Sequence, residues 1–175
     1  EGFEAGGHNG REETTTMVLV PQVVDAVRIP VVAAGGIADG RSMAAALALG
    51  AEGVQMGSRF VATPEASAHA AFKSEVLAAG EGATQLTLKE LAPVRLIKNP
   101  FYERVAEAYA RGASTDELRE LLGRGRAKKG MYEGDLVQGE LEIGQVASRI
   151  TTLRPAAEIV RETVTQCTET LKRLC

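Results

Sequence analysis

The chain has 175 residues, which is long enough for one domain with a buried core. Hydrophobic residues make up 45% and charged residues 25%, as in ordinary globular proteins. The formal net charge of -3 and the 4% aromatic content argue against a nucleic-acid partner, which calls for a basic surface and stacking side chains. No apolar run approaches the length of a membrane span, so we also expect no membrane partner.

The first expected elements follow a glycine-rich turn at residues 1–10. Valines recur at helical spacing between residues 20 and 27, which predicts a helix from about residue 21. The β-branched run 29–32 predicts a buried strand. Residues 41–50 predict a helix, with Asp39 placed to cap its first turn.

A second strand is predicted within residues 51–61, and it ends at Gly57-Ser58. Thr63-Pro64-Glu65 has the residue types of a helix start and predicts a helix through about residue 79. Helices and short strands therefore alternate over the first 80 residues, which is typical of βα units and a parallel sheet.

The pattern changes after residue 80. One or two irregular strands are expected within 85–98, a helix from Asn99 to about residue 111, and a second helix opened by the Ser114 capping box. A basic loop at 124–129 and a short helix or turn at 143–146 follow. Residues 155–174 predict a long helix with one buried apolar face, formed by Val160, Val164, Cys167, Leu171 and Leu174.

The two cysteines, Cys167 and Cys175, fall on this last predicted helix. Eight residues of helix rise about 12 Å, which is too far for a disulfide. We therefore expect two free thiols in a reducing cytoplasm.

Two glycine turns follow the predicted parallel strands at their carboxyl ends. Gly35-Gly36 follows the first strand, and Gly57-Ser58 follows the second. Glycine lets the backbone approach a ligand closely, and exposed N–H groups at such turns bind phosphate. Two such turns in succession suit the last strands of a (β/α)8 barrel, whose phosphate site is built from the loops after strands seven and eight. A doubly wound sheet is the alternative.

His8 lies in a glycine-rich turn where its ring would be accessible. An imidazole titrates near neutral pH and can act as a general acid or base. The alternative is a loop histidine without a chemical role. His69 is expected within a helix, as a structural or solvated residue. The histidines and cysteines lack the spacing of a metal site, so no metal is expected.

Three motifs together resemble the nitronate monooxygenase family, formerly called 2-nitropropane dioxygenases, and the related flavin-dependent enoyl-acyl-carrier-protein reductases. They are Glu4-Ala5-Gly6-Gly7-His8, Ala33-Ala34-Gly35-Gly36-Ile37-Ala38-Asp39-Gly40 and Gly53-Val54-Gln55-Met56-Gly57-Ser58-Arg59-Phe60. The Gly144-Gln145 pair also has a counterpart in the family.

The resemblance implies an α/β fold, the C-terminal part of a (β/α)8 TIM barrel with a helical appendix. Residues 1–80 would be the closing βα units of the FMN-binding barrel, and 81–175 a lid or irregular segment with the C-terminal helices. His8 matches the catalytic histidine, and Gly144-Gln145 would belong to the lid. The matches to residues that contact FMN and its phosphate are Gly7, Gly35, Gly36, Gln55, Met56, Gly57 and Ser58.

The activity that the resemblance implies is FMN-dependent oxidation of nitronates or nitroalkanes by O2 to carbonyl compounds and nitrite. The alternatives are enoyl-thioester reduction with NAD(P)H, which the basic loop 124–129 would suit through an acidic carrier protein, and a truncated, non-catalytic barrel that binds a phosphate ligand. A homo-oligomer is compatible with any of these.

The chain is shorter than the family implies. A full barrel takes about 250 residues, so this chain has room for only the last strands, and we expect it to be a C-terminal portion. Because the first flavin-binding loops would be missing, we expect the chain by itself to bind FMN weakly or not at all.

Overall fold

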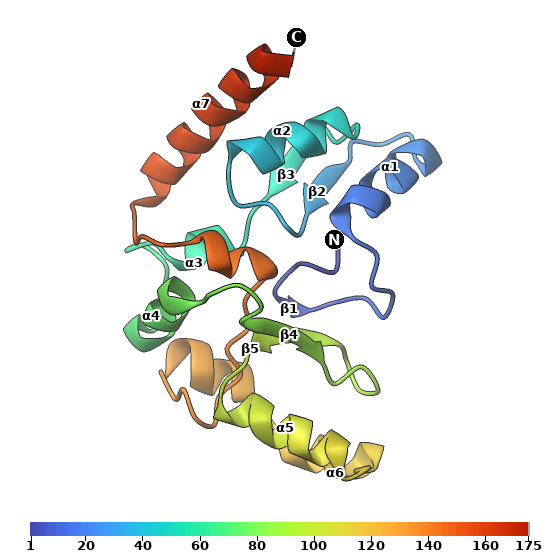
Figure 1. The fold of residues 1–175 in the computed structure, drawn as a ribbon, viewed down its shortest axis with the longest axis vertical. Helices are drawn as coiled ribbons and strands as arrows, with labels where there is room; N and C mark the ends of the chain where they lie inside the picture. The colour runs from blue at the N-terminus through green and yellow to red at the C-terminus, as the bar shows by residue number, and fades with distance from the viewer. Residues whose placement is uncertain (175) are drawn as a thin grey trace.

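A computed structural model describes residues 1–174, which form an α/β fold with two small sheets (Figure 1). The strands are β1 (Gly7–His8), β2 (Val32–Ala34), β3 (Gly53–Gln55), β4 (Thr84–Thr87) and β5 (Val94–Ile97). The α-helices are α1 (Thr16–Ala26), α2 (Gly40–Ala48), α3 (Ser58–Val61), α4 (Ala70–Ala78), α5 (Pro100–Ala110), α6 (Thr115–Leu122) and α7 (Ala156–Leu174). Two further helical segments are the π-helix η1 (Lys128–Tyr132) and the 3-10 helix η2 (Gln145–Arg149).

The predicted parallel pair is confirmed. Strands β2 and β3 run parallel with Ala33 opposite Val54, and α1 and α2 lie beside them (Figure 1). Strand β2 begins three residues later than expected. Pro30 lacks the N–H that a ladder requires, and Ile29 is 70% exposed, so the pairing starts only after this segment.

The second sheet is antiparallel, in the order β1-β5-β4. Its strands β4 and β5 confirm the elements expected within 85–98. The short strand β1 pairs with β5, with Gly7 opposite Arg95 and His8 opposite Val94. The histidine turn is therefore held by a strand from much later in the chain.

The helix caps expected from the sequence are confirmed at three places. Asp39 and Ser42 form a reciprocal capping box at the start of α2, and Ser114 and Glu117 form another at the start of α6. Asn99 accepts a hydrogen bond from the backbone N–H of the third residue after it and caps α5. These caps satisfy N–H groups that the first helical turn leaves without partners.

The helix expected from Thr63 begins later, at Ala70. The Thr63 hydroxyl donates to the Phe60 carbonyl and accepts from the Ala66 N–H, so the Thr-Pro-Glu segment forms a local turn. His69 is the cap of α4, since its Nδ1 accepts from the Ala71 N–H at 3.1 Å. The expectation that His69 lies within a helix was wrong.

The buried face of α7 also differs from the prediction. Its buried residues are Ile159, Thr163 and Cys167, whereas Val160 and Val164 are about half exposed. The reason is the close approach of α2, because a Cβ added to Gly40 would lie 2.3 Å from the Cys167 backbone nitrogen. Helices that touch through their backbones need small side chains at the crossing, which the apolar periodicity does not reveal.

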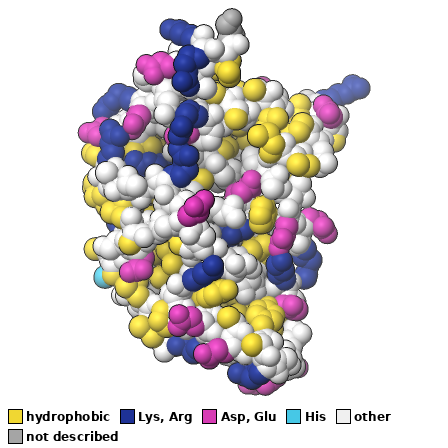
Figure 2. All heavy atoms as spheres, viewed as in Figure 1, with side chains coloured by type: hydrophobic (Ala, Val, Ile, Leu, Met, Phe, Trp, Pro, Cys, Tyr) yellow, Lys and Arg dark blue, Asp and Glu magenta, His cyan; other side chains and the backbone are white. Residues whose placement is uncertain are grey.

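Cys167 is a buried free cysteine. Cys175 lies outside the described residues, so the expectation that these two cysteines form no disulfide stays a prediction. Within residues 1–174, no helix is both long and apolar enough to cross a lipid bilayer. Figure 2 shows basic side chains along α7 and apolar ones gathered over α1. The exposed apolar residues near α1 and β2 include Met17, Val18, Ile29 and Val32.

Candidate functional site

The structure brings the two glycine turns together at one cleft. Gly35 and Gly36, after β2, and Gly57 and Ser58, after β3, line a hollow of about 220 Å³. Gly7 and Gly144 also line it. A whole drug-sized ligand commonly occupies about 300–1,000 Å³, so this hollow has room for part of such a molecule.

The backbone of the cleft has the features of an anion cradle. Gly35 and Gly36 have φ values of +96° and +68°, a region that side chains strongly disfavour. Among the described residues, no hydrogen-bond acceptor is recorded for the N–H groups of Gly36, Gly57 or Ser58. A Cβ added to Gly57 would meet no atom within 4 Å. Backbone N–H groups without partners at such turns can bind a phosphate.

A loop from the C-terminal half closes one side of the cleft. The Gly144 N–H donates to the Ser58 hydroxyl at 2.9 Å, and the Gln145 N–H donates to the Glu4 carbonyl at 2.9 Å. The loop packs so closely that a Cβ on Gly6 would lie 2.4 Å from the Gly144 nitrogen. Three segments distant in sequence are therefore joined through backbone contacts at the cleft.

Glu4 is connected to the Gly35-Gly36 turn through Thr16. Its carboxylate accepts from the Thr16 backbone N–H and lies within hydrogen-bond distance of the Thr16 hydroxyl, which is also 3.0 Å from the Gly35 carbonyl. The carboxylate thus accepts the first N–H of α1, and the Thr16 hydroxyl links this helix to the glycine turn. Sequence reasoning assigned Glu4 only to a motif; its role depends on a contact that the spacing does not indicate.

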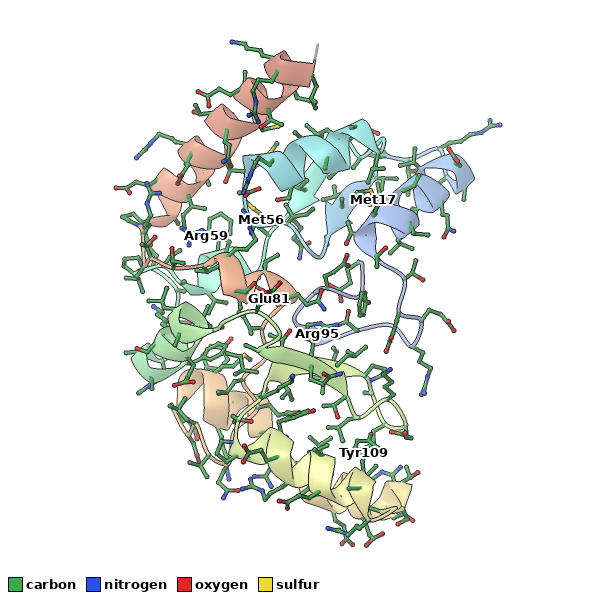
Figure 3. All side chains as sticks on the ribbon, viewed as in Figure 1. Met17, Met56, Arg59, Glu81, Arg95 and Tyr109 are labelled. Atoms are coloured by element: carbon green, nitrogen blue, oxygen red, sulfur yellow. The ribbon has the colours of Figure 1, made fainter. Side chains whose placement is uncertain are left out.

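Arg95 anchors the histidine turn from the sheet. Its side chain is 2% exposed, and its guanidinium donates to the Phe3 carbonyl at 2.8 and 3.0 Å and lies 5.0 Å from the centre of the Phe3 ring (Figure 3). Burial lowers the pKa of this guanidinium. Sequence analysis did not single out Arg95, because the surrounding residues indicated only a strand.

His8 is exposed and lies outside the cleft of the glycine turns. It lines a second hollow of about 210 Å³, together with Leu88, Val94, Glu140 and Glu142. Its neighbour Gly7 lines the first cleft, and in the described part of the chain Glu142 is the one residue that lines both hollows. The glutamate therefore stands between the predicted base and the predicted phosphate cradle.

The structure separates the remaining predicted contact residues. Gln55 lines the cleft. Met56 does not, and it packs instead against the core cluster that includes Ala33 of β2 and Ala46 of α2. Val54, which precedes Gln55 on β3, packs against the same core as Met56, so the neighbours of Gln55 point away from the cleft.

The cleft is unusual in its charge. Glu1, Glu4 and Glu142 line it, and no lysine or arginine of the described residues does. An anion bound here would depend on backbone N–H groups. Arg59, next to the cradle, lies toward α7 in Figure 3. Burial and the nearby Arg154 lower the pKa of its guanidinium, and Glu162 opposes this shift.

Two carboxyl groups that line the hollow of His8 have raised pKa values. Burial and the neighbouring Glu142 raise the pKa of Glu140 to about 7, although Arg126 opposes the shift. Burial also raises the pKa of Glu142, and His8 opposes that shift. A raised pKa near neutrality is common where proton transfer occurs, although structural clusters show it too.

Glu140 should make the stability of the protein depend on pH. Because its folded-state pKa lies above its unfolded value, the folded state gains protons relative to the unfolded state, and stability falls as the pH rises from about 4.5 to about 7. Glu140→Gln should therefore stabilise the protein by about 2–3 kcal/mol at pH 8 and hardly at all at pH 4. Chemical denaturation at both pH values measures the difference, and an equal effect at both would contradict it.

In residues 1–174, no group of three or more His, Cys, Asp or Glu side chains is placed to hold a metal ion.

The family model described as nitronate monooxygenase matches residues 1–166. A nitronate monooxygenase from Metarhizium robertsii is 38% identical, over 93% of this chain and 49% of that protein.

Two solved structures have the same fold. FabK from Thermotoga maritima, an enoyl-acyl-carrier-protein reductase, is 41% identical with a TM-score of 0.91, over 99% of this chain and 54% of that one. Nitroalkane oxidase from Streptomyces ansochromogenes is 34% identical with a TM-score of 0.77, over 100% of this chain and 52% of that one. The chain spans about half the length of the curated relatives it matches.

Proposed function

The chain belongs to the nitronate monooxygenase family. From that membership we propose that it is part of an FMN-dependent oxidoreductase, namely the part that binds the phosphate of the cofactor and carries the catalytic base. The proposed reaction is oxidation of a nitronate or nitroalkane by O2 to a carbonyl compound and nitrite. The barrel of which β2 and β3 would be the last two strands is part of this proposal. The observation that carries it is the meeting of the Gly35-Gly36 and Gly57-Ser58 turns at one cleft.

The residues of the cleft fit the phosphate end of FMN. The short helix α3 starts at Ser58, directly after β3, where barrels frequently bind phosphate at the N-terminus of a short extra helix. The N–H groups without recorded acceptors at Gly36, Gly57 and Ser58 would donate to the phosphate oxygens. Ser58 already accepts from Gly144, so its hydroxyl hydrogen remains for the ligand.

The chain's own residues would do three things. The glycine turns would position the phosphate, the loop at Gly144 would exclude water from that end, and His8 would take a proton from the carbon next to the nitro group. FMN, when bound, would supply the redox chemistry. Because His8 lines the adjoining hollow, the reacting carbon is proposed to sit where the two hollows meet, near Glu142.

The second candidate function is enoyl-thioester reduction with NAD(P)H. It is favoured by the likeness to FabK, which has the higher identity and TM-score of the two solved structures. Here His8 would deliver a proton instead of removing one. The two functions differ in what reduces the flavin. Anaerobic mixing of the complete, flavin-loaded protein with a nitronate or with NADH, followed at the flavin absorbance band, separates them; bleaching by NADH alone would reject the nitronate assignment.

His8→Ala tests the base role in the complete protein. We expect turnover of a neutral nitroalkane to fall by roughly 10²- to 10⁴-fold, because general-base catalysis commonly contributes that much. Flavin content should stay the same, since His8 lies outside the cleft of the glycine turns. Steady-state kinetics and the absorbance spectrum measure both, and unchanged nitroalkane turnover would remove His8 from the mechanism.

Gly57→Val tests the phosphate cradle. The added side chain has open space, so stability should change by less than about 0.5 kcal/mol. In the complete protein the side chain should block a phosphate, so FMN affinity should fall at least about tenfold while riboflavin affinity stays nearly constant. Gly80→Val is the matched control, since Gly80 is also unhindered and does not line the cleft. Equal losses for FMN and riboflavin would place the phosphate elsewhere.

A further inference from the structure

Three acid–base side chains lie on one face of the antiparallel sheet. Strand β5 pairs with β4 along one edge, and its other edge carries His8 opposite Val94 and Glu142 opposite Leu96. Residues opposite each other in a ladder share a face, and Val94 and Leu96 are two apart, so His8 and Glu142 share theirs. Glu140, two residues before Glu142, lines the hollow of His8 together with it.

The Glu142 carboxylate packs against Gly7, next to His8 in the chain. Along the edge of β5, Glu142, Gly7 and His8 occupy successive positions, although they come from two ends of the chain. A Cβ on Gly7 would lie 2.8 Å from the Glu142 Oε2 atom, so the carboxylate occupies the space that a side chain would take. It therefore lies beside the residue that directly precedes His8.

The position of Glu142 links the two hollows. It lines the cleft of the glycine turns on one side and the hollow of His8 on the other. The charged groups around it are His8 on β1, Glu140 on its own segment, Arg126 beyond Glu140, and Glu1 and Glu4 across the cleft. Arg126 donates to the carbonyls of Leu121, Leu122 and Gln138 and opposes the raised pKa of Glu140, whereas His8 is the cation that opposes the raised pKa of Glu142.

We propose that Glu142, at the junction of the two hollows, is the group that accepts, across the hollow it shares with His8, the proton that His8 takes from the substrate. The proton leaves the substrate carbon for the imidazole, and then leaves the imidazolium for the Glu142 carboxylate, which restores the neutral base. The chemical step rests on the function proposed above. The coupling of the two side chains does not.

The coupling is tested without any substrate. In the complete protein with ¹³C-labelled glutamate, Glu142→Gln identifies the Glu142 carboxyl signal by its disappearance. His8→Asn removes the positive charge that opposes the raised pKa of Glu142, so the Glu142 titration should move upward by about 1 pH unit. An unmoved titration would overturn the proposal, whatever reaction the protein catalyses.

The chemical step is tested by a pair of substrates. A neutral nitroalkane must lose a proton, whereas a preformed nitronate has already lost it. Glu142→Gln should lower turnover of the nitroalkane by roughly 10- to 100-fold and that of the nitronate by less than about twofold, and Glu142→Asp should recover part of the loss. Equal losses for both substrates would overturn the relay.

Glu140→Gln is the matched control. Glu140 is buried on the same face but does not line the cleft of the glycine turns. Its replacement should leave the ratio of nitroalkane to nitronate turnover within about twofold of the parent; a change as large as that of Glu142→Gln would overturn the assignment to Glu142. If neither substrate is turned over while the Glu142 titration still depends on His8, the proposed function fails and the coupling stands.

Discussion

Gly6→Ala should destabilise the protein by about 3 kcal/mol and open the cleft. The added methyl group would lie 2.4 Å from both the Gly144 nitrogen and the Ile143 carbonyl carbon. Both are backbone atoms, so no side chain can rotate away, and overpacking of this kind costs about 1–3 kcal/mol or more. The loop at Gly144 must move, which breaks its hydrogen bond to Ser58 and that of Gln145 to Glu4.

Thermal denaturation measures the loss of stability, and hydrogen exchange at the Gly144 and Gln145 amides measures the opening. Gly10→Ala is the matched control, because Gly10 lies in the same turn and a Cβ there meets nothing within 4 Å. Gly10→Ala should leave both measurements unchanged. Similar exchange rates in the two variants would show that the loop is not held by this packing.

Gly40→Ala should loosen α7 at a cost of about 2–3 kcal/mol. Its methyl group would lie 2.3 Å from the Cys167 nitrogen and 2.3 Å from the Thr163 carbonyl oxygen. The helix preference of alanine offsets up to about 1 kcal/mol, but the clash with a neighbouring backbone is larger. The variant should also lose the hydrogen bond from the Gly40 N–H to the Gln166 side chain, which is 2.8 Å long.

The loosening caused by Gly40→Ala should be confined to the C-terminal helix α7. Limited proteolysis should cut α7 at Arg161 far faster in the variant, while the segment from β2 to β3 stays protected. Gly80→Ala serves as the control, since a Cβ there has no neighbour within 4 Å. If α7 resists cleavage equally in both variants, the crossing at Gly40 does not hold the helix.

Local patterns predicted the parallel unit well. The alternation of short apolar runs and helices placed β2, α2 and β3, and the types of Asp39, Asn99 and Ser114 located three helix caps. These features depend on neighbours within a few residues. The meeting of the two glycine turns also followed from local order, because parallel strands end at a common edge.

Contacts between distant segments were not predictable in the same way. The start of α4 was misjudged because the residues typical of a helix start at Thr63 form a local turn instead, and the buried face of α7 was misjudged because a glycine crossing outweighs apolar periodicity. The place of His8 beside Glu142 depends on β5, which pairs with both. Neither Glu142 nor Arg95 belongs to a sequence motif that would indicate a role at the site.

The pairing of β1 with β5 has a consequence for how the protein is made. The β2–β3 unit can form as soon as its own residues leave the ribosome, but the imidazole-bearing strand must wait for a template synthesised much later. Contacts between such remote positions slow folding, because a long loop must close first. During translation the glycine turns after β2 and β3 should therefore acquire their shape before the turn that carries His8, which is completed only once β5 has been made.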